Sequence, residues 1–506
     1  MLSPDFIFET SWEVCNRVGG IYAVLSTRAA SMQKEHPDKV VFFGPDFGEH
    51  SNQFFQEDAQ LLRAWVAQFH KEHPDIPLRV GRWLVPGQPI AVLLKADALW
   101  ARKDEIYAWA WENFHVQSHA AYGDYDESSL FGYVAGMAMA SLYDGLQASR
   151  AEQAPLRVVA HANEWQTAFT VFYLRHYRPQ VGTLFTTHAT SIGRSIAGNG
   201  KPLYDYFTGY NGDQMAEELN MVSKHSAEKQ AAHFADCFTT VSDLTAKECA
   251  QLLDKPVDIV TPNGFEPNFV PKGKAFPIHR AAARKALKEV AEQQLGGVVP
   301  QDAMFVCIAG RQEWKNKGID IFLHAMERLG ELIYEQKTVR EVVAFVMIPY
   351  LDRPVRRFGK VSVVFVPYYL NGQDPLFGKS YYDLLIGMDA SVFPSYYEPW
   401  GYTPLESVAF HVPTVTTTLA GFGLWVERDS IEAGDSVKVI VRNDSNYYEV
   451  VEQVAQQLVH LSQLTDEQME AVRNTAAKVA RKAEWRYFFK YYRQAYAIAL
   501  KRAAQR

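Results

Sequence analysis

The sequence predicts an α/β protein that contains two doubly wound parallel sheets. Short apolar, β-branched runs alternate along the whole chain with longer helical patterns. Continuously apolar strands separated by helices are typical of parallel sheets that are covered on both faces. A turn-rich tetrapeptide, Thr-Pro-Asn-Gly at residues 261–264, follows one of these runs and separates them into two sets. The doubly wound arrangement is therefore predicted to occur twice.

The predicted strands are short and apolar in both halves of the chain. They cover residues 6–10, 40–43, 91–94, 158–160, 183–186, 238–241 and 257–260 in the first half, and 305–309, 342–348, 361–366 and 391–393 in the second. Helices are predicted from near Ile21 and over residues 281–296, 382–388 and 484–506, the last of them dense in aromatic residues.

These elements predict three parts of the chain. Residues 1–262 form a first Rossmann-like domain, residues 263–480 a second one, and residues 481–506 a C-terminal helix. Two sheets that face each other leave a central cleft at the carboxyl ends of their strands, where the ligands of such sheets bind. Residues from both halves are therefore expected to contribute to the chemistry.

The composition is that of an ordinary globular protein. Of the 506 residues, 48% are hydrophobic and 22% are charged, and the formal net charge is −7. This acidic balance argues against nucleic acid or an anionic membrane as the partner. The four cysteines lack the spacing of a metal or disulfide framework, and neither a signal peptide nor a spanning helix is predicted. We therefore expect a cytoplasmic protein without a metal site.

A first candidate loop follows the strand at residues 6–10 and contains Arg17, Gly19 and Gly20. Paired glycines let a ligand approach the backbone, and N–H groups at the start of a helix attract anions. The same pair also fits a tight strand-to-helix turn, and it is not the GxGxxG fingerprint.

A second candidate loop follows the strand at residues 305–309 and carries Arg311, Lys315 and Lys317. Cations at a strand end suit a diphosphate, because Arg offers a planar fork and Lys a point charge. A solvated charged loop has the same composition. The position of Arg311 directly after the strand favours the binding role.

The densest signal is the string Phe-Pro-Ser-Tyr-Tyr-Glu-Pro-Trp-Gly-Tyr-Thr-Pro-Leu-Glu at residues 393–406. Here Thr403 is predicted as an N-cap, Pro404 as the first helical residue and Glu406 as the third, which is a capping box. Glu398 precedes this helix in a loop rich in proline and glycine. That loop is unsuited to filling a core, so the carboxylate of Glu398 is predicted to reach a ligand.

Four further residues are candidates with weaker local signals. His161 follows the strand at residues 158–160, and His188 and Arg194 follow the strand at residues 183–186. A histidine just past a strand end is a candidate for the cleft, although a lone histidine more often has a structural role. Tyr381, just before a predicted helix, shows no distinguishing pattern of its own.

Taken together, these segments closely resemble the glycogen synthases of the animal and fungal type. The resemblance runs almost end to end and in order, and the string at residues 394–404 is highly specific. Other matching strings are Asn-Arg-Val-Gly-Gly-Ile-Tyr at 16–22, Phe-Thr-Thr-His-Ala-Thr at 185–190, Phe-Thr-Thr-Val-Ser at 238–242, Ala-Gly-Arg at 309–311 and Asn-Lys-Gly at 316–318.

The resemblance implies the GT-B architecture of two Rossmann-like domains, with the C-terminal helix crossing back to the first domain. It implies transfer of glucose from UDP-glucose to the 4-hydroxyl of an α-1,4-glucan with retention of configuration, without a cofactor or a metal. ADP-glucose is an alternative donor that would leave the rest of this interpretation unchanged. Whether Glu398 attacks the sugar or only stabilises it stays open, and we favour a front-side reaction in which the departing phosphate takes the acceptor's proton.

The resemblance also implies a role for each candidate residue. Arg311 and Lys317 neutralise the leaving diphosphate, which Gly19 and Gly20 approach and Arg194 helps to bind. Tyr381 stacks on uracil, Glu406 binds the ribose hydroxyls, and Glu398 lies beside the transferred glucose. His161 and His188 contact that glucose or the acceptor. The remaining residues assigned to nucleotide-sugar binding are Arg17, Tyr402 and Thr403.

Several departures from the family pattern qualify these expectations. The second histidine of the family's His-x-His-Glu-Trp string is Asn163 here. The family's arginine-rich helix that senses glucose 6-phosphate should lie just before Trp485. This chain offers only Arg473, Lys478, Arg481 and Lys482 there, more sparsely spaced. We therefore expect an enzyme that is not regulated by glucose 6-phosphate, and we make no prediction of its oligomeric state.

Two other classes of function compete with this interpretation. A GT-B enzyme that acts on a small acceptor, such as a sugar phosphate, would share the donor residues. A glucan-binding scaffold without activity would share the fold, but it would have no need of Arg311, Lys317, Glu398 and Glu406 together. A phosphorylase is disfavoured because no segment resembles its pyridoxal-phosphate lysine site.

Overall fold

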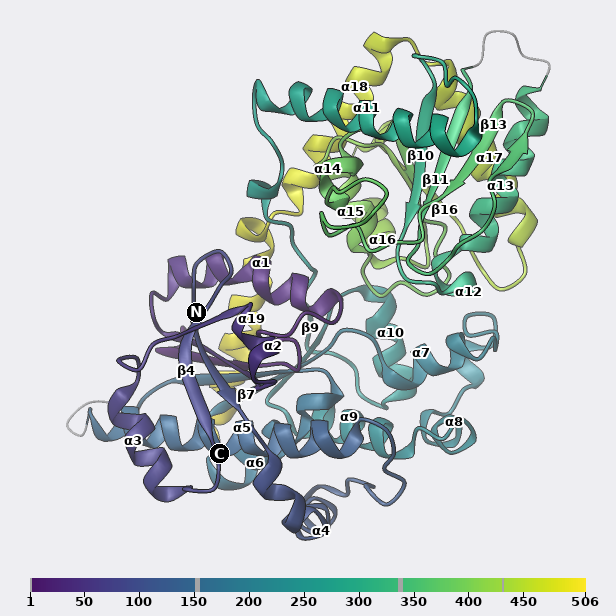
Figure 1. Ribbon diagram of the computed structural model, residues 1–506. Coiled ribbons are helices and arrows are strands. Elements are labelled where there is room, and N and C mark those ends of the chain that lie inside the picture. Colours follow the sequence, from purple (N-terminus) through teal and green to yellow (C-terminus); the bar gives the residue numbers. More distant parts are fainter. Residues whose placement is uncertain (1, 151–154, 335–339, 430–431) are drawn as a thin grey trace. The chain divides into compact units, whose positions relative to one another are not determined.

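Figure 1 shows the computed structural model, which describes residues 2–150, 155–334, 340–429 and 432–506. The chain divides into two compact units. Unit 1 consists of residues 1–199, 206–264 and 485–506, and unit 2 consists of residues 200–205 and 265–484. The assignment of the short segment 200–205 to unit 2 was not predicted from the sequence.

The sheet of unit 1 has nine strands in the order β3-β4-β5-β2-β1-β6-β7-β8-β9. The run from β5 to β8 is parallel and follows the 3-2-1-4-5-6 order of a Rossmann sheet. The strands are β1 (Phe6–Thr10), β2 (Val40–Pro45), β3 (Phe55–Glu57), β4 (Leu78–Trp83), β5 (Ile90–Leu94), β6 (Val158–Asn163), β7 (Gly182–Thr187), β8 (Cys237–Thr240) and β9 (Ile259–Val260).

Helices cover both faces of this sheet, with α1 and α19 on one side and α5, α6 and α9 on the other (Figure 1). The helices of unit 1 are α1 (Gly20–Glu35), α2 (Glu49–Asn52), α3 (Arg63–Glu72), α4 (Lys103–Phe114), α5 (Tyr125–Ala148), α6 (Ala168–Tyr177), α7 (Ser191–Gly198), α8 (Gly212–Glu218), α9 (Val222–Phe234), α10 (Asp243–Leu252) and α19 (Trp485–Ala503). This double cover explains why β2, β5, β6 and β7 are buried at every residue.

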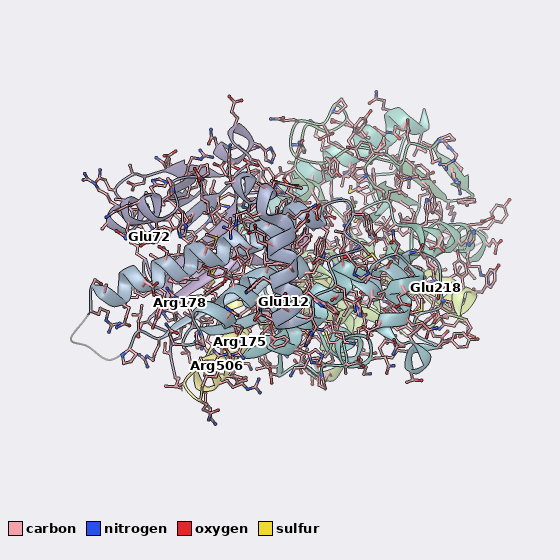
Figure 2. The ribbon with its side chains drawn as sticks, turned by 90° about the horizontal axis from the view of Figure 1, so that it is seen from below. Glu72, Glu112, Arg175, Arg178, Glu218 and Arg506 are labelled. Carbon is pink, nitrogen blue, oxygen red and sulfur yellow. The ribbon has the colours of Figure 1, made fainter. Side chains whose placement is uncertain are left out.

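The C-terminal helix α19 packs on unit 1 although it follows unit 2 in the sequence. Its buried face includes Trp485, Phe489 and Tyr492, and the indole N–H of Trp485 donates to Thr27 Oγ1 of α1 at 2.8 Å. The end of the chain is held by charge, because Arg506, labelled in Figure 2, pairs with Asp236 at 2.9 Å. Arg175 of α6, labelled in the same view, pairs with this carboxylate at 3.2 Å.

Unit 2 repeats the arrangement with seven strands in the order β12-β13-β11-β10-β14-β15-β16. From β13 to β16 the strands are parallel and again follow the 3-2-1-4-5-6 order. The strands are β10 (Met304–Ala309), β11 (Val342–Met347), β12 (Arg356–Phe358), β13 (Val361–Phe365), β14 (Ala390–Val392), β15 (Thr414–Thr417) and β16 (Val437–Ile440). The prediction of two doubly wound, Rossmann-like sheets is confirmed.

Helix α13 packs against α17, while α11 contacts α14 and α15 contacts α18 (Figure 1). The helices of unit 2 are α11 (Ala275–Leu295), α12 (Trp314–Lys317), α13 (Ile319–Ile333), α14 (Tyr381–Leu385), α15 (Tyr402–Ala409), α16 (Gly421–Arg428), α17 (Tyr447–Gln463) and α18 (Asp466–Lys482). The predicted helix over residues 281–296 begins earlier, at Ala275, and ends at Gly296 in the left-handed conformation.

Every strand predicted from an apolar run is present, but strands without such a run were missed. The missed strands are β3, β4, β12, β15 and β16. β3 and β4 add an antiparallel edge to unit 1, and β12 adds one to unit 2. The basic segment around Arg356 and Arg357 contains no apolar run. It pairs with β13 while its arginines remain exposed, and an edge strand of this kind carries no apolar signal.

Candidate active site

The strand order reverses once in each sheet, between β1 and β6 in unit 1 and between β10 and β14 in unit 2. Ligands of doubly wound sheets bind outside the carboxyl ends of the strands at this point. The loop after β1 carries Gly19 and Gly20. In unit 2 the loop after β10 carries Arg311, and the loop after β14 carries Glu398. The topology therefore places predicted residues of both units at these switch points.

The glycine loop of unit 1 is shaped by the carboxylate of Glu13. Its Oε2 accepts hydrogen bonds from the backbone N–H groups of Gly19 at 2.7 Å and Tyr22 at 2.9 Å. Because α1 starts at Gly20 without a side-chain cap, Glu13 supplies the missing acceptor for its first turn. A Cβ at Gly20 would meet no atom within 4 Å. The backbone is thus open to a ligand there, beside the exposed Arg17.

His161 lies in the core of unit 1, with none of its surface exposed. Its Nε2 is 2.7 Å from Thr186 Oγ1, and its Nδ1 is 3.2 Å from the Glu9 carboxylate, which also pairs with the buried Arg28. Burial, reinforced by the Arg28 guanidinium, lowers the pKa of His161. The expected direct contact of His161 with a sugar has no support in this position, because β6 is covered along its whole length.

His188 follows β7 and is joined to the same network by Asn163. Its Nε2 is 3.0 Å from Asn163 Oδ1, while Asn163 Nδ2 donates to Glu9 at 3.0 Å and to the Thr10 carbonyl at 3.1 Å. Since Oδ1 only accepts, His188 Nε2 carries a hydrogen and its Nδ1 has the lone pair. Burial is the main cause that lowers the pKa of His188 to about 3. The imidazole is therefore neutral and offers an acceptor at Nδ1.

Two buried carboxylates hold the loop that carries His188. Glu164 Oε1 accepts the backbone N–H groups of His188 at 2.7 Å and Ala189 at 3.2 Å. Glu228, on α9, accepts from the hydroxyl of Thr187 and from both the N–H and the hydroxyl of Ser191, at 2.8 and 2.7 Å. Burial and the nearby Glu228 raise the pKa of Glu164. No sequence pattern predicted this function of either glutamate.

Glu164 adopts a left-handed backbone, with φ of +68°, which is costly for a residue with a Cβ. This conformation directs the Glu164 side chain toward the His188 loop. The hydrogen bonds that the side chain makes there offset the cost of the strained backbone. Arg194 is the fourth residue of α7 and is exposed. The N-terminus of α7 is capped by Thr190, whose Oγ1 accepts the Gly193 N–H at 3.1 Å.

In unit 2, Lys317 and Glu398 form an ion pair. Their side chains are 19% and 14% exposed, so the pair is neither fully buried nor free in solvent. The two loops that carry them are joined by the Asn316 carbonyl, which accepts the N–H groups of Tyr396 at 2.9 Å and Tyr397 at 3.2 Å. The approach is close enough that a Cβ on Gly318 would fall 2.1 Å from the Pro394 carbonyl oxygen. Only glycine fits this contact.

Arg311, on the same loop, is 62% exposed and pairs with Glu313 at 2.9 Å. Lys315 is directed elsewhere, because its ammonium lies 3.9 Å from the centre of the Tyr396 ring. The Tyr396 hydroxyl donates to Asp444 and accepts the Leu203 N–H at 2.9 Å. The short segment 200–205 is thereby attached to the loop that leads to Glu398.

The predicted capping box at Thr403 is wrong. Helix α15 begins at Tyr402 and its N-cap is Gly401, with no side-chain cap. Gly401 has φ of +106°, and this conformation, which other residues avoid, lets the helix begin before Thr403. Pro404 still lies in the first turn, where its missing N–H has no intrahelical partner to lose. Glu406 consequently faces α14 instead of the N-cap.

The partner of Glu406 is Tyr382, whose hydroxyl donates to Oε1 at 2.7 Å. Tyr381 is the first residue of α14, and the helix is capped by a Ser380–Asp383 capping box that the sequence analysis missed. The Tyr381 hydroxyl is buried without a hydrogen-bond partner among the described residues, and burial raises its pKa. The structure thus brings Tyr381, Glu406, Tyr402 and Thr403 together at the start of two neighbouring helices.

Two features are absent from the described residues. No group of three or more His, Cys, Asp or Glu residues is arranged to hold a metal ion among them. None of the helices in the described ranges is both long and apolar enough to cross a membrane.

Solved structures share this fold across nearly the whole chain. The catalytic domain of starch synthase IV from Arabidopsis thaliana, bound to ADP and acarbose, matches with a TM-score of 0.60 and 15% identity, over 99% of this chain and 100% of that one. An α,α-trehalose-phosphate synthase from Burkholderia vietnamiensis matches with a TM-score of 0.55 and 13% identity, over 99% and 100%. The fold is the GT-B fold of two Rossmann-like units.

The chain belongs to the glycogen synthase family, whose model matches residues 9–356 and 355–506. It is 26% identical to the glycogen [starch] synthase of Dictyostelium discoideum, over 99% of this chain and 67% of that protein. It is also 26% identical to the liver glycogen [starch] synthase of Homo sapiens, over 98% of this chain and 84% of that protein. The resemblance seen in the sequence is therefore confirmed.

Proposed function

We propose that this enzyme transfers glucose from UDP-glucose to the non-reducing 4-hydroxyl of an α-1,4-glucan, with retention of configuration and without a metal ion. The observation that carries the proposal is the Lys317–Glu398 ion pair at the switch point of unit 2, with Arg311 on the same loop as Lys317. Fixed cations beside a carboxylate match what is needed when a diphosphate leaves an anomeric carbon.

The donor is bound, in this proposal, mainly by unit 2. Arg311 and Lys317 neutralise the diphosphate as negative charge builds on its leaving oxygen. Tyr381 packs on the uracil ring, and Glu406 accepts from the ribose hydroxyls beside Tyr402 and Thr403. The hydrogen bond from Tyr382 to Glu406 supports this assignment, because it orients the Glu406 carboxylate at the first turns of α14 and α15.

Unit 1 supplies further donor contacts. Arg17 and Arg194 are the exposed cations beside the two loops that its buried carboxylates shape. The open backbone at Gly20, with Gly19 held by Glu13, suits an anionic oxygen at the start of α1. We assign Arg17, Gly19, Gly20 and Arg194 to the nucleotide sugar on these grounds.

The chemical step breaks the bond between the anomeric carbon and the phosphate oxygen, and the electron pair leaves with UDP. The acceptor's 4-hydroxyl forms the new bond on the same face, and its proton passes to the departing phosphate. Because Glu398 is engaged by Lys317, its carboxylate is better suited to stabilising the positively charged sugar than to attacking it. His188, neutral and with its Nδ1 lone pair available, accepts from a sugar hydroxyl, while His161 positions His188 through Glu9 and Asn163.

The proposal includes neither a metal nor a cofactor. Arg311 and Lys317 supply the positive charge that a metal ion would otherwise provide. We also propose a cytoplasmic location, since the four cysteines are buried free thiols and such thiols are typical of reducing compartments.

The test is incubation of the purified protein with radiolabelled UDP-glucose and glycogen in EDTA, with ADP-glucose in parallel. Released nucleoside diphosphate and incorporated glucose are measured separately. We expect incorporation from UDP-glucose that EDTA does not reduce. Incorporation from ADP-glucose alone would show that ADP-glucose, and not UDP-glucose, is the donor. A requirement for added metal would overturn the metal-free mechanism.

Two other outcomes would indicate that the proposed acceptor or the proposed activity is wrong. Release of nucleoside diphosphate without incorporation into glycogen would indicate a different, small acceptor. Binding of glycogen by a folded protein that releases no diphosphate from either donor would indicate a scaffold. For the mechanism, a Glu398→Gln variant that keeps most of its turnover would exclude an essential role for that carboxylate.

A further inference from the structure

Three loops of unit 2 meet at the aromatic ring of Tyr396, a side chain that is 1% exposed. They follow β10, β14 and β16, whose carboxyl ends lie at the same edge of one parallel sheet. The first loop carries Lys317, the second carries Glu398 and the third carries Asp444. The loop after β16 carries none of the groups assigned to the substrates, yet it contacts both of the other loops.

Cations from two of these loops lie over the Tyr396 ring. The Lys315 ammonium is 3.9 Å from the ring centre, and the guanidinium carbon of Arg442 is 5.4 Å from it. Arg442 also donates to the Pro394 carbonyl, and the Asn316 carbonyl accepts the Tyr396 N–H at 2.9 Å. Contacts between a cation and a ring are strongest where water is excluded. The orientation of this buried ring therefore depends on all three loops.

The carboxylate of Asp444 fixes the hydroxyl end of the ring. Its Oδ1 accepts from the Tyr396 hydroxyl, and its Oδ2 accepts the N–H groups of Tyr204 at 2.9 Å and Asp205 at 2.8 Å. The Asp444 side chain is 7% exposed, so these donors replace the water that it has lost. Burial and the adjacent carboxylate raise the pKa of Tyr396, so its hydroxyl stays protonated and continues to donate.

The loop that carries Asp444 is held in shape by its own side chains. Asn443 Oδ1 accepts the N–H groups of Ser445 and Asn446, each at 2.9 Å, and Asn446 Oδ1 accepts the Asn443 N–H at 2.9 Å. Asn446 Nδ2 donates to the Val441 carbonyl at 2.8 Å. Bonds from asparagine side chains to nearby backbone stabilise a turn by themselves. The turn therefore presents Asp444 in a defined position.

The ring and the reacting groups are close in the sequence. Tyr396 comes two residues before Glu398, and Lys315 comes two residues before Lys317. A displacement of the ring therefore moves the backbone that carries both members of the Lys317–Glu398 ion pair. Because a misplacement of about 1 Å can cost about 100-fold in rate, contacts that fix this backbone affect turnover.

We propose that Asp444 is a positioning residue for glucosyl transfer. Through Tyr396 it holds the Glu398 carboxylate and the Lys317 ammonium where the reaction requires them, and it touches neither substrate. The inference rests on the proposed function and adds to it a residue from a third loop. The same carboxylate holds the segment 200–205, so its loss releases that segment together with the loop that carries Glu398.

The test uses two variants that act on one contact, and their combination. Asp444→Ala removes the carboxylate, while Tyr396→Phe removes only the hydroxyl and keeps the ring. All proteins are full-length, and thermal unfolding confirms that each is folded. The kcat and the KM values for UDP-glucose and glycogen are measured, and amide hydrogen exchange is followed by mass spectrometry over residues 200–205 and 394–398.

Each variant has a matched control in unit 1. Asp236→Ala removes a buried aspartate that accepts the Thr183 N–H at 2.8 Å. That contact lies at the amino ends of β7 and β8, the edge of the sheet opposite to the one where ligands bind. Tyr107→Phe removes a hydroxyl that donates to the Asp126 carboxylate at 2.6 Å, as the Tyr396 hydroxyl does to Asp444.

We expect each test variant to lower kcat by about tenfold and to change both KM values by less than about threefold. The double variant should lose no more activity than Asp444→Ala, because groups that act through one contact are not additive. Amide exchange over residues 200–205 and 394–398 should be faster in both test variants. Both controls should keep their kcat, although Asp236→Ala loses stability.

Three results would overturn the inference. The first is an unchanged kcat in both test variants, which would leave the contact a purely structural role. The second is an equal fall of kcat in Asp236→Ala, because lost stability would then explain the effect. The third is a raised KM for UDP-glucose at normal kcat, which would assign Asp444 to donor binding. If Asp444→Ala does not fold, Tyr396→Phe and its control Tyr107→Phe decide.

The exchange measurement separates this inference from the proposed function. If the unmodified protein transfers no glucose to glycogen but both segments exchange faster in the test variants, the proposed function fails and the positioning of the two segments by Asp444 stands. If the unmodified protein transfers glucose and the variants match it in both kcat and amide exchange, the proposed function stands and the inference fails.

Discussion

The two units use their acidic and basic side chains at the switch points in different ways. In unit 1 the carboxylates of Glu13, Glu164 and Glu228 are buried, and each accepts two or more hydrogen bonds from a loop. In unit 2, Arg311 is 62% exposed, and both side chains of the Lys317–Glu398 pair are partly exposed to solvent. A buried carboxyl group is tolerated only where several partners replace water. Unit 1 therefore uses buried hydrogen-bond acceptors to shape backbone, and unit 2 keeps charge accessible to a ligand.

The comparison predicts the largest effect on turnover in unit 2. Replacing Lys317 by Met should lower kcat by about 10²–10³-fold, the usual effect of removing one group that stabilises transition-state charge. The free energy of unfolding should change by no more than about 1 kcal/mol, because the ion pair is partly exposed. Turnover and chemical denaturation are measured on the same preparation. Lys285→Met, at an exposed site on α11, is the control, and a loss of less than tenfold would contradict the assignment.

In unit 1 the same kind of change should act on stability. Glu228→Ala leaves the Thr187 hydroxyl and both donors of Ser191 without their acceptor. We expect the free energy of unfolding to fall by about 3 kcal/mol, measured by denaturant titration. Glu217→Ala, at an exposed position on α8, should be neutral. A Glu228→Ala protein that keeps its stability and loses only activity would contradict the distinction between the two units.

The contact that joins the Lys317 and Glu398 loops can be tested through glycine. Gly318→Ala should destabilise the protein by about 2–3 kcal/mol, because its positive φ is strained and its Cβ would lie 2.1 Å from the Pro394 carbonyl. Gly378 has a similar φ of +59° but open space around it. Gly378→Ala should therefore cost about 1 kcal/mol, the strain alone. Equal losses of stability in the two variants would show that the close approach does not matter.

The buried histidines predict acid sensitivity of unit 1. The pKa of His188 is lowered to about 3, so the folded chain binds fewer protons than the unfolded chain below pH 6.5. Stability is then present above that pH and is lost as the pH falls. Between pH 6.5 and pH 5 the loss attributable to His188 is about 2 kcal/mol. Denaturant titrations at both pH values measure it.

The matched comparison is between His188→Gln and His70→Gln, an exposed site on α3. Only His188→Gln should flatten the dependence on pH. The carboxyl of Glu164, whose pKa is raised, acts in the opposite direction, and stability from it is lost as the pH rises. It is present in both variants, so it does not affect their difference. Equal slopes in the two variants would contradict the burial of a neutral His188.

The smallest effect is expected from glucose 6-phosphate. Arg473 donates to Asp389 at 2.6 Å, and Arg280 and Arg284 pair with the same carboxylate at 2.8 and 2.7 Å. Among the described residues that line the adjoining cavity of about 810 Å³, four arginines are balanced by four carboxylates. We therefore expect initial rates to be unchanged by glucose 6-phosphate, and strong activation would refute this.

The match between sequence and structure differs from element to element. Strand β10 was predicted because every residue of it is buried and apolar, and such a run leaves a clear signal. Strand β12 left none, because two of its three residues are exposed arginines. The helix after Glu398 was predicted, but its start was placed at Thr403 instead of Gly401. The N-cap is a left-handed glycine, which has no capping side chain, so no residue pattern indicates that the helix begins there.

The sequence by itself determined the two doubly wound sheets, the family and the cations and carboxylate of unit 2, because these depend on local runs and on specific strings. Only the tertiary structure decided that His161 is buried, that Glu13, Glu164 and Glu228 hold the loops, and that Tyr396 joins three loops of unit 2. Each of these facts depends on residues from separate strands and helices, and burial changes both the charge that a side chain carries and the partners that it requires.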